Sequence, residues 1–392
     1  MKIGIVLSNT PAYSETFFTS KIKGLQQNGF EVVLFVAHQN KAFHLCTVCK
    51  APYSSKKNPF KLFFSILKVV LKLVFKLKRL IKFIKFEKED GANFIEILKN
   101  IYLNAHILTT KNLNWLHFGF ATQAIGRENL AKTIGAKMAV SIRGFDIGIY
   151  PIKNKGCYNK LWSKIDKLHT ISNDLLNLAY ANGFKKNVPY QKITPAIDTS
   201  FFINQSSNDA SNKNKLKLMT IGRLHWKKDY TSVIIALKNL KDRGIDFEYT
   251  IIGDGQEEEK LKYLVHELGL INNIIFTGKI SQKEILIYFK KSHFYLQYSL
   301  QEGFCNAVLE AQAMGVLPIV SNAEGLSENV VNNKTGWVIQ KNSPKLLTEK
   351  IVEVINLSQN HKEKIRKQAT ERVTKEFNIE KQQKEFIDFY TQ

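Results

Sequence analysis

The chain contains little cysteine and little proline. Of its 392 residues, four are cysteine and eight are proline, while 11% are aromatic. Four cysteines are too few for a disulfide scaffold and are typical of a reducing compartment. The aromatic content and the scarcity of proline exclude a largely disordered chain. With 44% hydrophobic residues, the length suffices for two packed domains or one large one.

The sequence also lacks the patterns of a secretory leader and of a membrane span in its most apolar stretch. Residues 1–7 are typical of a first buried strand, not of a charged segment followed by an apolar one. Stretch 56–85 is interrupted by lysines too often for a transmembrane helix, which needs about 18 uncharged residues. We therefore expect a cytoplasmic protein.

Acidic residues are in the minority. The chain has 34 Asp+Glu against 57 Lys+Arg, a formal net charge of +23. Such an excess predicts an acidic partner, which could be nucleic acid, a phosphorylated substrate or an anionic membrane. Stretch 56–85 alone holds ten Lys/Arg and no acidic residue. The cations that recur at helical spacing within it are Lys61, Lys68, Lys72, Lys76, Arg79, Lys82 and Lys85.

The basic stretch predicts an amphipathic helix. A lysine face opposite a Phe/Leu/Val face is typical of a helix that lies in a membrane interface, at the inner face of the plasma membrane. The alternative is a helix packed on its own domain with a solvated lysine face. We favour the membrane because no carboxylate balances the lysines. A nucleic-acid-binding protein is a further alternative, but phenylalanines at helical spacing favour lipid, so no nucleic acid is expected.

Strand and helix signals alternate along the chain, which predicts an α/β fold of two doubly wound, Rossmann-like domains facing a central cleft. We expect an N-terminal domain at 1–200 with the basic insertion at 56–86, a linker at 201–215 and a second domain at 216–375. A C-terminal helix at 376–392 is expected to pack back on the first domain. The expected strands are 3–7, 31–37, 115–118, 138–142, 168–171, 216–221, 249–252, 274–276, 294–297 and 317–320, with helices from residues 14, 121, 229 and 256.

The most informative motif places two carboxylates eight residues apart, Glu302 and Glu310, with a helix start between them (EGFCNAVLE). Eight residues make just over two helical turns, so both carboxylates fall on about the same side. Such a pair can bind a polyhydroxylated ligand, and the amides before the helix can hold an anion. The alternative is a capping Glu302 and a solvated Glu310, which the spacing alone favours.

A second motif, GRLHWKK at 222–228, ends a strand and opens a helix. Arg223 and Lys228 would project from the carboxyl edge of the sheet, where ligands of such sheets bind. A guanidinium and an ammonium there suit a diphosphate. The alternative is a pair of surface cations.

The order of these motifs resembles the family 4 retaining glycosyltransferases of the GT-B fold. The motif string is strand–GRLHWKK–helix, IIGDGQEEEKL, FTGKIS, QYSLQEGFCNAVLEAQAMGVLPIVS and ENVVNNKTGWVI over about 215–340. In the first half, PAYSETF, HFGFA and SIRGFDI are similar to the bacterial polysaccharide and lipopolysaccharide branch. The resemblance implies transfer of a UDP- or GDP-linked sugar to a glycan or lipid-linked acceptor.

The resemblance also implies a role for each matching residue. Glu310 would bind the ribose hydroxyls of the nucleotide-sugar and Glu302 the transferred sugar, while Arg223 and Lys228 would hold the pyrophosphate. His117 would lie near the donor sugar, so the expected catalytic residues are Glu302, His117, Arg223 and Lys228. The remaining donor-binding positions are Gly253, then Lys279 and Ile280, where the family's backbone reads the nucleobase, and the backbone of Gly303, Phe304 and Cys305.

The sequence departs from the family at several positions. Arg143 stands where many members have histidine, and it could contact an anion or pair with Asp146. Asp229 replaces a common glycine and is expected to cap a helix, and Glu328 is expected to act structurally or on the donor side. No Asp-x-Asp is present, which fits a reaction without metal or cofactor.

Two further interpretations stay open. A nucleotide-sugar epimerase or hydrolase of the same fold would act on the donor without transferring the sugar. A metal or redox site at Cys46 and Cys49 is disfavoured, since no second ligand pair is evident.

Overall fold

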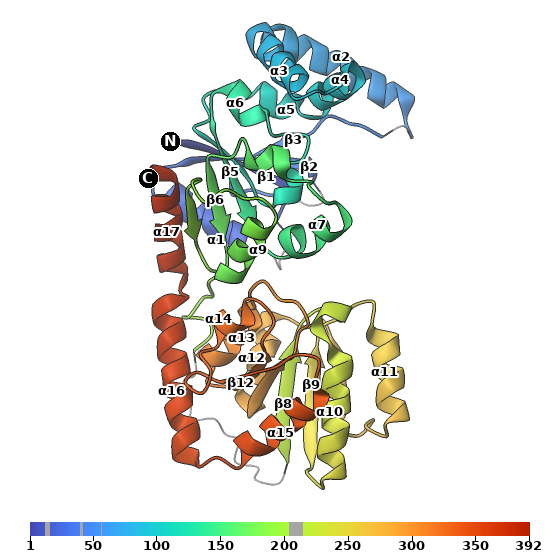
Figure 1. Ribbon diagram of the computed structural model, residues 1–392, viewed down its shortest axis with the longest axis vertical. Helices are drawn as coiled ribbons and strands as arrows, with labels where there is room; N and C mark the ends of the chain where they lie inside the picture. Colours follow the sequence, from blue (N-terminus) through green and yellow to red (C-terminus); the bar gives the residue numbers. More distant parts are fainter. Residues whose placement is uncertain (12–15, 40–41, 56, 204–214) are drawn as a thin grey trace. The chain divides into compact units, whose positions relative to one another are not determined.

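The structure, a computed structural model, describes residues 1–11, 16–39, 42–55, 57–203 and 215–392. The chain folds into two compact units, drawn in sequence colours in Figure 1. Unit 1 comprises Met1–Ile193 and Gln382–Gln392, and unit 2 comprises Thr194–Lys381. Unit 1 therefore ends earlier than the expected boundary at 200. The expected linker at 201–215 lies mostly outside the described residues.

Unit 1 is built on a seven-stranded parallel sheet with the order β3-β2-β1-β4-β5-β6-β7. Strands β1 and β2 are rich in Val, Ile and Leu, and their middle residues are buried, as is all of the central strand β4, which fits parallel strands covered on both faces. The edge strands β3 and β7 were not expected from the sequence, because they are short and partly exposed. The strands are β1 (Lys2–Asn9), β2 (Glu31–His38), β3 (Thr47–Lys50), β4 (Trp115–Phe118), β5 (Lys137–Ile142), β6 (Lys167–Thr170) and β7 (Tyr190–Lys192).

One face of this sheet is covered by α1 (Thr16–Gln27) and by the C-terminal helix α17 (Ile379–Thr391). Phe17, Phe18 and Ile22 of α1 share a buried cluster with Phe386 and Phe389 of α17. The rest of unit 1 contains the short helices α5 (Ala105–Leu108), α6 (Leu130–Ile134), α7 (Tyr150–Lys153), α8 (Asn159–Trp162) and α9 (Asn173–Ala181).

The helix expected from residue 121 is not continuous. The chain forms a 3-10 turn, η1 (Ala121–Gln123), and α6 begins only at Leu130. Gly126 lies between them with a φ of 72°, a left-handed conformation that ends a right-handed helix. The prediction of one helix here was wrong.

The basic stretch forms two helices rather than one, α2 (Pro59–Val74) and α3 (Leu77–Glu89), and is followed by α4 (Phe94–Leu103) (Figure 1). Neither proline nor glycine lies at the break. Instead, α2 packs near α5 through its buried Val69 and Leu73, whereas α3 packs near α6 through Phe83 and Glu87. The break lets each helix turn its own buried residues to a different neighbour.

Buried polar contacts fix the insertion to unit 1. Glu87 is fully buried and accepts hydrogen bonds from Asn129 at 2.7 Å and Asn100 at 2.9 Å. Asp90 binds Lys164 at 2.6 Å and Lys160 at 3.0 Å. Although desolvation opposes it, the hydrogen bonds from Lys164, Asn129 and Lys160 lower the pKa of Asp90 to about 2. The insertion therefore has a defined orientation within unit 1.

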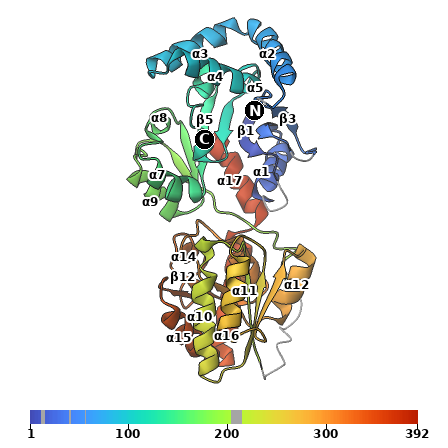
Figure 2. The same ribbon diagram turned by 90° about the vertical axis from the view of Figure 1, so that its right-hand side faces the viewer.

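Unit 2 is a second parallel sheet with the order β10-β9-β8-β11-β12-β13. Helix α10 packs beside α11 and α15, and α13 packs beside α16 (Figure 2). Asp229 caps α10 by accepting the Ser232 N–H at 3.3 Å, which confirms the expected cap.

The strands of unit 2 are β8 (Leu216–Ile221), β9 (Phe247–Ile252), β10 (Ile274–Gly278), β11 (Phe294–Gln297), β12 (Leu317–Ser321) and β13 (Trp337–Ile339). Its helices are α10 (Tyr230–Asp242), α11 (Glu258–Glu267), α12 (Gln282–Lys291), α13 (Asn306–Ala313), α14 (Leu326–Asn329), α15 (Pro344–Ile355) and α16 (Gln359–Glu376).

Candidate active site

The strand order of unit 2 reverses between β8 and β11. The chain runs outward from β8 through β9 to β10, then crosses back to β11 on the other side of β8. At such a point the loops that leave two neighbouring strands diverge, and ligands of open parallel sheets bind there. Both motifs follow these two strands, so Lys228 comes from one side of the switch point and Glu302 from the other.

Lys228 and Glu302 form an ion pair, a contact between residues 74 positions apart. Both side chains are mostly buried, at 18% and 16% exposure. Burial disfavours the ammonium, but the Glu302 carboxylate outweighs that effect and raises the pKa of Lys228 above its ordinary value. Lys228 thus carries a fixed positive charge at the switch point.

The loops after β8 and β9 are in direct backbone contact. The Gly222 N–H donates to the Ile252 carbonyl at 2.9 Å, and the Leu224 N–H donates to the Asp254 carbonyl at 2.8 Å. A Cβ at Gly253 would lie 2.1 Å from the Gly222 oxygen, and the φ of Gly253 is 138°. Glycine is therefore required at 253 to keep these two loops together.

Glu310 lies on α13, and Glu302 lies in the loop before that helix. Within the part of the chain that the structure describes, no residue donates a hydrogen bond to the Glu310 carboxyl group. Desolvation alone raises the pKa of Glu310 to about 7. A partly buried carboxyl group with free acceptor oxygens is suited to the hydroxyls of a ligand.

The loop before α13 presents two amides without protein partners. No described residue accepts a hydrogen bond from the N–H of Gly303 or Phe304. Cys305 differs, because its N–H already donates to the Asn329 side chain at 2.9 Å. We expected the backbone of all three residues to contact the nucleotide-sugar. Only the N–H groups of Gly303 and Phe304 remain available to donate hydrogen bonds to it.

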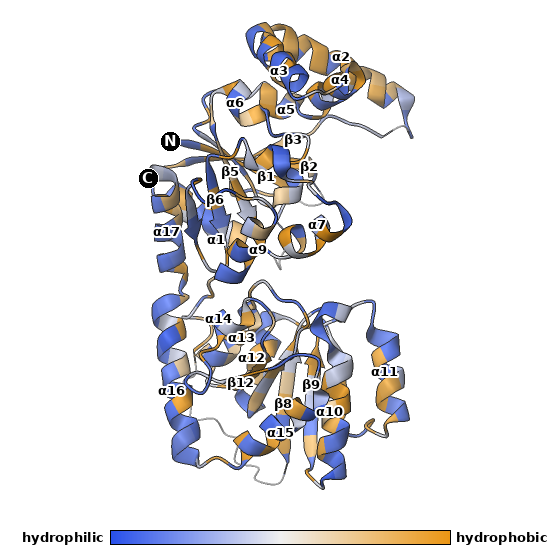
Figure 3. Cartoon of the chain, viewed as in Figure 1, coloured by the Kyte–Doolittle hydropathy of each residue, from blue (hydrophilic) through white to orange (hydrophobic). Residues whose placement is uncertain are grey.

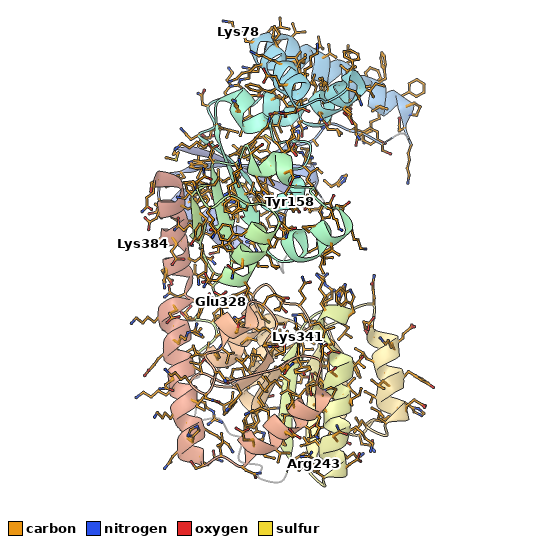
Figure 4. All side chains as sticks on the ribbon, in the orientation of Figure 1. Lys78, Tyr158, Arg243, Glu328, Lys341 and Lys384 are labelled. Atoms are coloured by element: carbon orange, nitrogen blue, oxygen red, sulfur yellow. The ribbon has the colours of Figure 1, made fainter. Side chains whose placement is uncertain are left out.

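The other predicted donor residues of unit 2 also follow strands. Arg223 is exposed after β8. Lys279 follows β10 and pairs with Asp254, at the end of β9, at 2.8 Å, and Ile280 beside it is half-buried. Figure 4 labels Glu328 on α14 and Lys341 beyond β13. Lys341 donates to the Leu300 carbonyl at 2.8 Å.

Sequence reasoning missed two residues of this site, Glu324 and Asn329. The Glu324 carboxylate accepts the Glu302 N–H at 2.7 Å, and Asn329 contacts Cys305. Both follow β12, the strand next to β11, and no spacing rule links them to the EGFC motif. Their place after a strand adjacent to the switch point was the one available signal.

His117 lies in the core of unit 1. It is 1% exposed, its Nδ1 is 2.5 Å from the Tyr390 hydroxyl, and its Nε2 is 2.8 Å from Ser141 Oγ. Lys21, fully buried as well, approaches Nδ1 at 3.1 Å. Desolvation, with the nearby Lys21 charge, lowers the pKa of His117 well below its usual range. This burial contradicts the expected contact of His117 with a donor sugar, because a sugar cannot reach the ring.

Asp146 contacts Arg143 through the Arg143 backbone amide. The Asp146 carboxylate accepts the N–H groups of Arg143 and Gly144, each at 3.0 Å, and that of Ala121 at 3.1 Å. The Arg143 guanidinium lies 3.6 Å from the centre of the Phe17 ring. Asp146 therefore ties together the loops after β4 and β5. The PAYSETF segment lies largely outside the described residues.

Metal ligands are not gathered anywhere in the described ranges: no group of three or more His, Cys, Asp or Glu side chains there could hold an ion. Desolvation raises the pKa of the Cys46 thiol to about 11 and also raises the pKa of Cys49. Among the described helices, none is both long and apolar enough to span a bilayer.

The fold and the sequence both match known proteins. The structure aligns over 99% of its length with the crystal structure of a glycosyltransferase from Rickettsia africae ESF-5, covering 97% of that chain, with a TM-score of 0.71 and 18% identity. It aligns equally with HepE of Anabaena in complex with UDP and glucose, covering 98% of that chain, with a TM-score of 0.72 and 13% identity. The fold is thus GT-B, two Rossmann-like parallel-sheet domains.

Residues 202–372 match the family described as Glycosyl transferases group 1. WcaL of Escherichia coli (strain K12), whose name assigns it to colanic acid biosynthesis, is 26% identical over 67% of this chain. The amylovoran biosynthesis glycosyltransferase AmsK of Erwinia amylovora is 30% identical over 57% of it. The chain covers 66% and 56% of these relatives, less than two thirds of each. The residues that match this family lie within unit 2.

Proposed function

We propose that this protein is a retaining glycosyltransferase of bacterial cell-surface polysaccharide or lipopolysaccharide synthesis. It moves a sugar from a UDP- or GDP-linked donor to a glycan or lipid-linked acceptor. The observation that carries the proposal is the Lys228–Glu302 pair at the switch point of unit 2, beside the free amides of Gly303 and Phe304. The group 1 match over this unit and the names of the relatives support it.

The proposed reaction needs charge stabilisation more than acid–base chemistry. The bond between the sugar's anomeric carbon and the donor phosphate oxygen breaks, and a bond from that carbon to the acceptor oxygen forms on the same face. The acceptor proton passes to the departing phosphate oxygen. Lys228 and Arg223 stabilise the diphosphate, and Glu302 holds the Lys228 ammonium and faces the sugar. Glu310 accepts the ribose hydroxyls.

In this proposal, neither a metal ion nor an organic cofactor takes part. Lys228, Arg223 and the amides of Gly303 and Phe304 supply the positive potential that a cation would otherwise give the diphosphate. Gly253, Lys279 and Ile280 lie on the nucleobase side. The argument against an epimerase or hydrolase comes from the relatives, which are named as biosynthetic glycosyltransferases.

The proposal includes an anionic membrane as partner, at the inner face of the plasma membrane. Figure 3 colours most of α2 as hydrophobic. We call the exposed apolar side chains of α2, α3 and α4, together with Phe75 between α2 and α3, the α2–α4 apolar surface. It comprises Phe60, Phe63, Phe64, Ile66, Leu67, Val70, Leu71, Val74, Phe75, Leu77, Ile81, Phe94, Ile95 and Leu98.

Cations border the α2–α4 apolar surface. Lys61, Lys68, Lys72 and Lys82 are exposed, and Lys78 of α3 is labelled in Figure 4. Arg79 does not join them, because it donates to the backbone carbonyls of Leu108 and Thr110. Apolar side chains of this extent beside exposed lysines suit a surface that inserts between anionic lipid headgroups.

The test is sugar transfer by the full-length protein. Purified protein is incubated with a panel of UDP- and GDP-sugars and a lipid extract that contains glycan acceptors, with and without EDTA. We expect transfer that EDTA does not abolish, with the anomeric configuration retained in the product. Lys228→Met should lower kcat/KM by roughly 100- to 1000-fold, as expected for loss of a charge that stabilises a leaving group.

The matched control is Lys262→Met, which removes an exposed lysine that pairs with Glu258 on α11. It should leave transfer unchanged. Donor hydrolysis or epimerisation without any transfer would refute the proposed reaction, and activity that only a divalent ion restores would refute its metal-free form.

A further inference from the structure

The segment from Glu302 to Cys305 is held in place by the loop that follows β12. At its start, the Glu302 N–H donates to Glu324 Oε2 at 2.7 Å, and the Glu302 carbonyl accepts the Gly325 N–H at 2.9 Å. At its end, Asn329 Oδ1 accepts the Cys305 N–H at 2.9 Å, and Asn329 Nδ2 donates to the Cys305 carbonyl at 3.1 Å. Both ends of the segment are therefore bound through their backbone.

The two loops also touch between these ends. A Cβ on Gly325 would lie 1.9 Å from the Gly303 oxygen and 3.2 Å from the Phe304 nitrogen. No side chain other than hydrogen fits there without moving the backbone. The loop after β12 thus acts as a close-fitting support for the segment.

Asn329 is itself fixed on its other side. It is fully buried, and its carbonyl accepts hydrogen bonds from Gln312 Nε2 at 3.1 Å and from Arg372 Nη1 at 2.8 Å. Arg372 Nη2 also donates to the Glu328 carbonyl at 2.8 Å. Because Arg372 belongs to α16 and Gln312 to α13, two helices fix the backbone at Asn329, from which the side-chain amide reaches Cys305.

We infer that Asn329 is a positioning residue of the donor site. It occupies both backbone groups of Cys305 and leaves the N–H groups of Gly303 and Phe304 available for the sugar or diphosphate of the donor. The inference builds on the proposed function, since it concerns the geometry of that same site. Donors fixed before the ligand arrives need no reorganisation when it binds, which is why their placement determines affinity and rate.

A purely structural role is the competing explanation, and a second buried asparagine of unit 2 separates the two. Asn273 is 7% exposed, and its Nδ2 donates to the Phe247 carbonyl at 2.9 Å. It lies at the amino ends of β9 and β10, the opposite edge of the sheet from the site. Asn273→Leu therefore removes a comparable buried hydrogen bond without touching the donor segment.

The experiment compares Asn329→Leu, Asn329→Asp and Asn273→Leu with the parent protein. Amide hydrogen exchange is measured for 302–306 without ligand, and titration calorimetry is performed with UDP, GDP and their sugar conjugates. We expect Asn329→Leu to speed exchange of the Cys305 N–H, which loses its acceptor, and to weaken binding of the sugar conjugate about tenfold, with kcat reduced as well. Asn329→Asp keeps the acceptor for the Cys305 N–H, so it should lie between Asn329→Leu and the parent.

The control should lower the melting temperature and leave exchange at 302–306 and donor affinity at parent values. If Asn329→Leu lowers the melting temperature like the control but keeps parent exchange and affinity, the inference is overturned. If that variant does not fold, Asn329→Asp and Arg372→Gln decide the question by the same measurements. A parent protein that binds no nucleotide refutes the proposed function instead, and the exchange comparison still tests whether Asn329 holds the segment.

Discussion

At the scale of single residues, Glu310 is the side chain whose environment most constrains its chemistry. Burial raises its pKa to about 7, and no described residue donates a hydrogen bond to it. Ribose hydroxyls would supply those missing donors and would favour the ionised form. The charge state of one carboxyl group should therefore be coupled to nucleotide binding near neutral pH.

Donor affinity should fall as the pH is lowered from 8 to 6. The fraction of Glu310 that is ionised drops about tenfold over this range for a pKa of about 7, and calorimetry should show a loss of affinity of roughly that size. Glu310→Gln should bind weakly at both pH values. A pH-independent affinity in the parent would contradict the role of Glu310.

The same group should affect stability with the opposite sign. Its folded pKa lies above its unfolded value, so the folded chain holds the proton more tightly. The contribution of Glu310 to the free energy of unfolding therefore falls as the pH rises from 4.5 through about 7. Without nucleotide, Glu310→Gln should melt at a higher temperature than the parent above pH 7.

Residues that follow the end of a strand could be placed near one another from the sequence alone. Lys228 and Glu302 meet across the switch point, as two motifs after neighbouring strands can. The burial of His117 could not be predicted from the sequence, because the side chain that covers it, Tyr390, is 273 residues away along the chain. Asn329 carries no local signal, since its partner is a backbone group of another loop.

At the scale of elements, the amphipathic helical pattern of the basic insertion could be predicted from the sequence. Its division into two helices could not. Lysine spacing predicted a helical segment, and α2 and α3 are helical. The break between them arises because α2 packs against α5 and α3 packs against α6. The spacing of residues within one segment carries no information about these neighbours. Most inner strands were predictable from their Val/Ile runs, whereas the short strands β3, β7 and β13 were not.

Reversing three lysines on α2 should release the protein from anionic vesicles. Lys61, Lys68 and Lys72 are exposed, and each contributes about 1 kcal/mol near an anionic surface, so loss of the three charges should weaken binding roughly 100-fold and their reversal to Glu should weaken it further. Flotation with phosphatidylglycerol-containing vesicles measures this. The control changes Lys364, Lys367 and Lys375 of α16 to Glu. Equal flotation of the two variants would contradict docking through α2.

At the scale of the whole molecule, the chain passes from unit 1 to unit 2 and back. The last residues, Gln382–Gln392, belong to unit 1, although Thr194–Lys381 make up unit 2. Phe386 and Phe389 of α17 are fully buried in the core of unit 1, and the Trp115 indole donates to the Tyr390 carbonyl at 3.1 Å. Unit 1 is therefore complete only when the end of the chain is present.

Phe389→Ala should destabilise unit 1 by about 3–5 kcal/mol, because a buried aromatic ring is replaced by a cavity. Calorimetry should show a lower melting temperature for one transition, while nucleotide affinity stays unchanged. The matched variant Ile351→Ala lies in the core of unit 2 and should lower the other transition. A loss of nucleotide affinity in Phe389→Ala at a temperature where both units are folded would contradict this separation.

The return of α17 to unit 1 also sets the order of events during protein synthesis. A ribosome that has finished Ile193 must translate all of unit 2 before it reaches Phe386, which takes roughly 10–40 s at ordinary elongation rates. Over that interval the apolar face that α17 later covers is open on the nascent chain. Chaperones that shield such surfaces should therefore engage unit 1 until α17 has been synthesised, although every strand of unit 1 is made earlier.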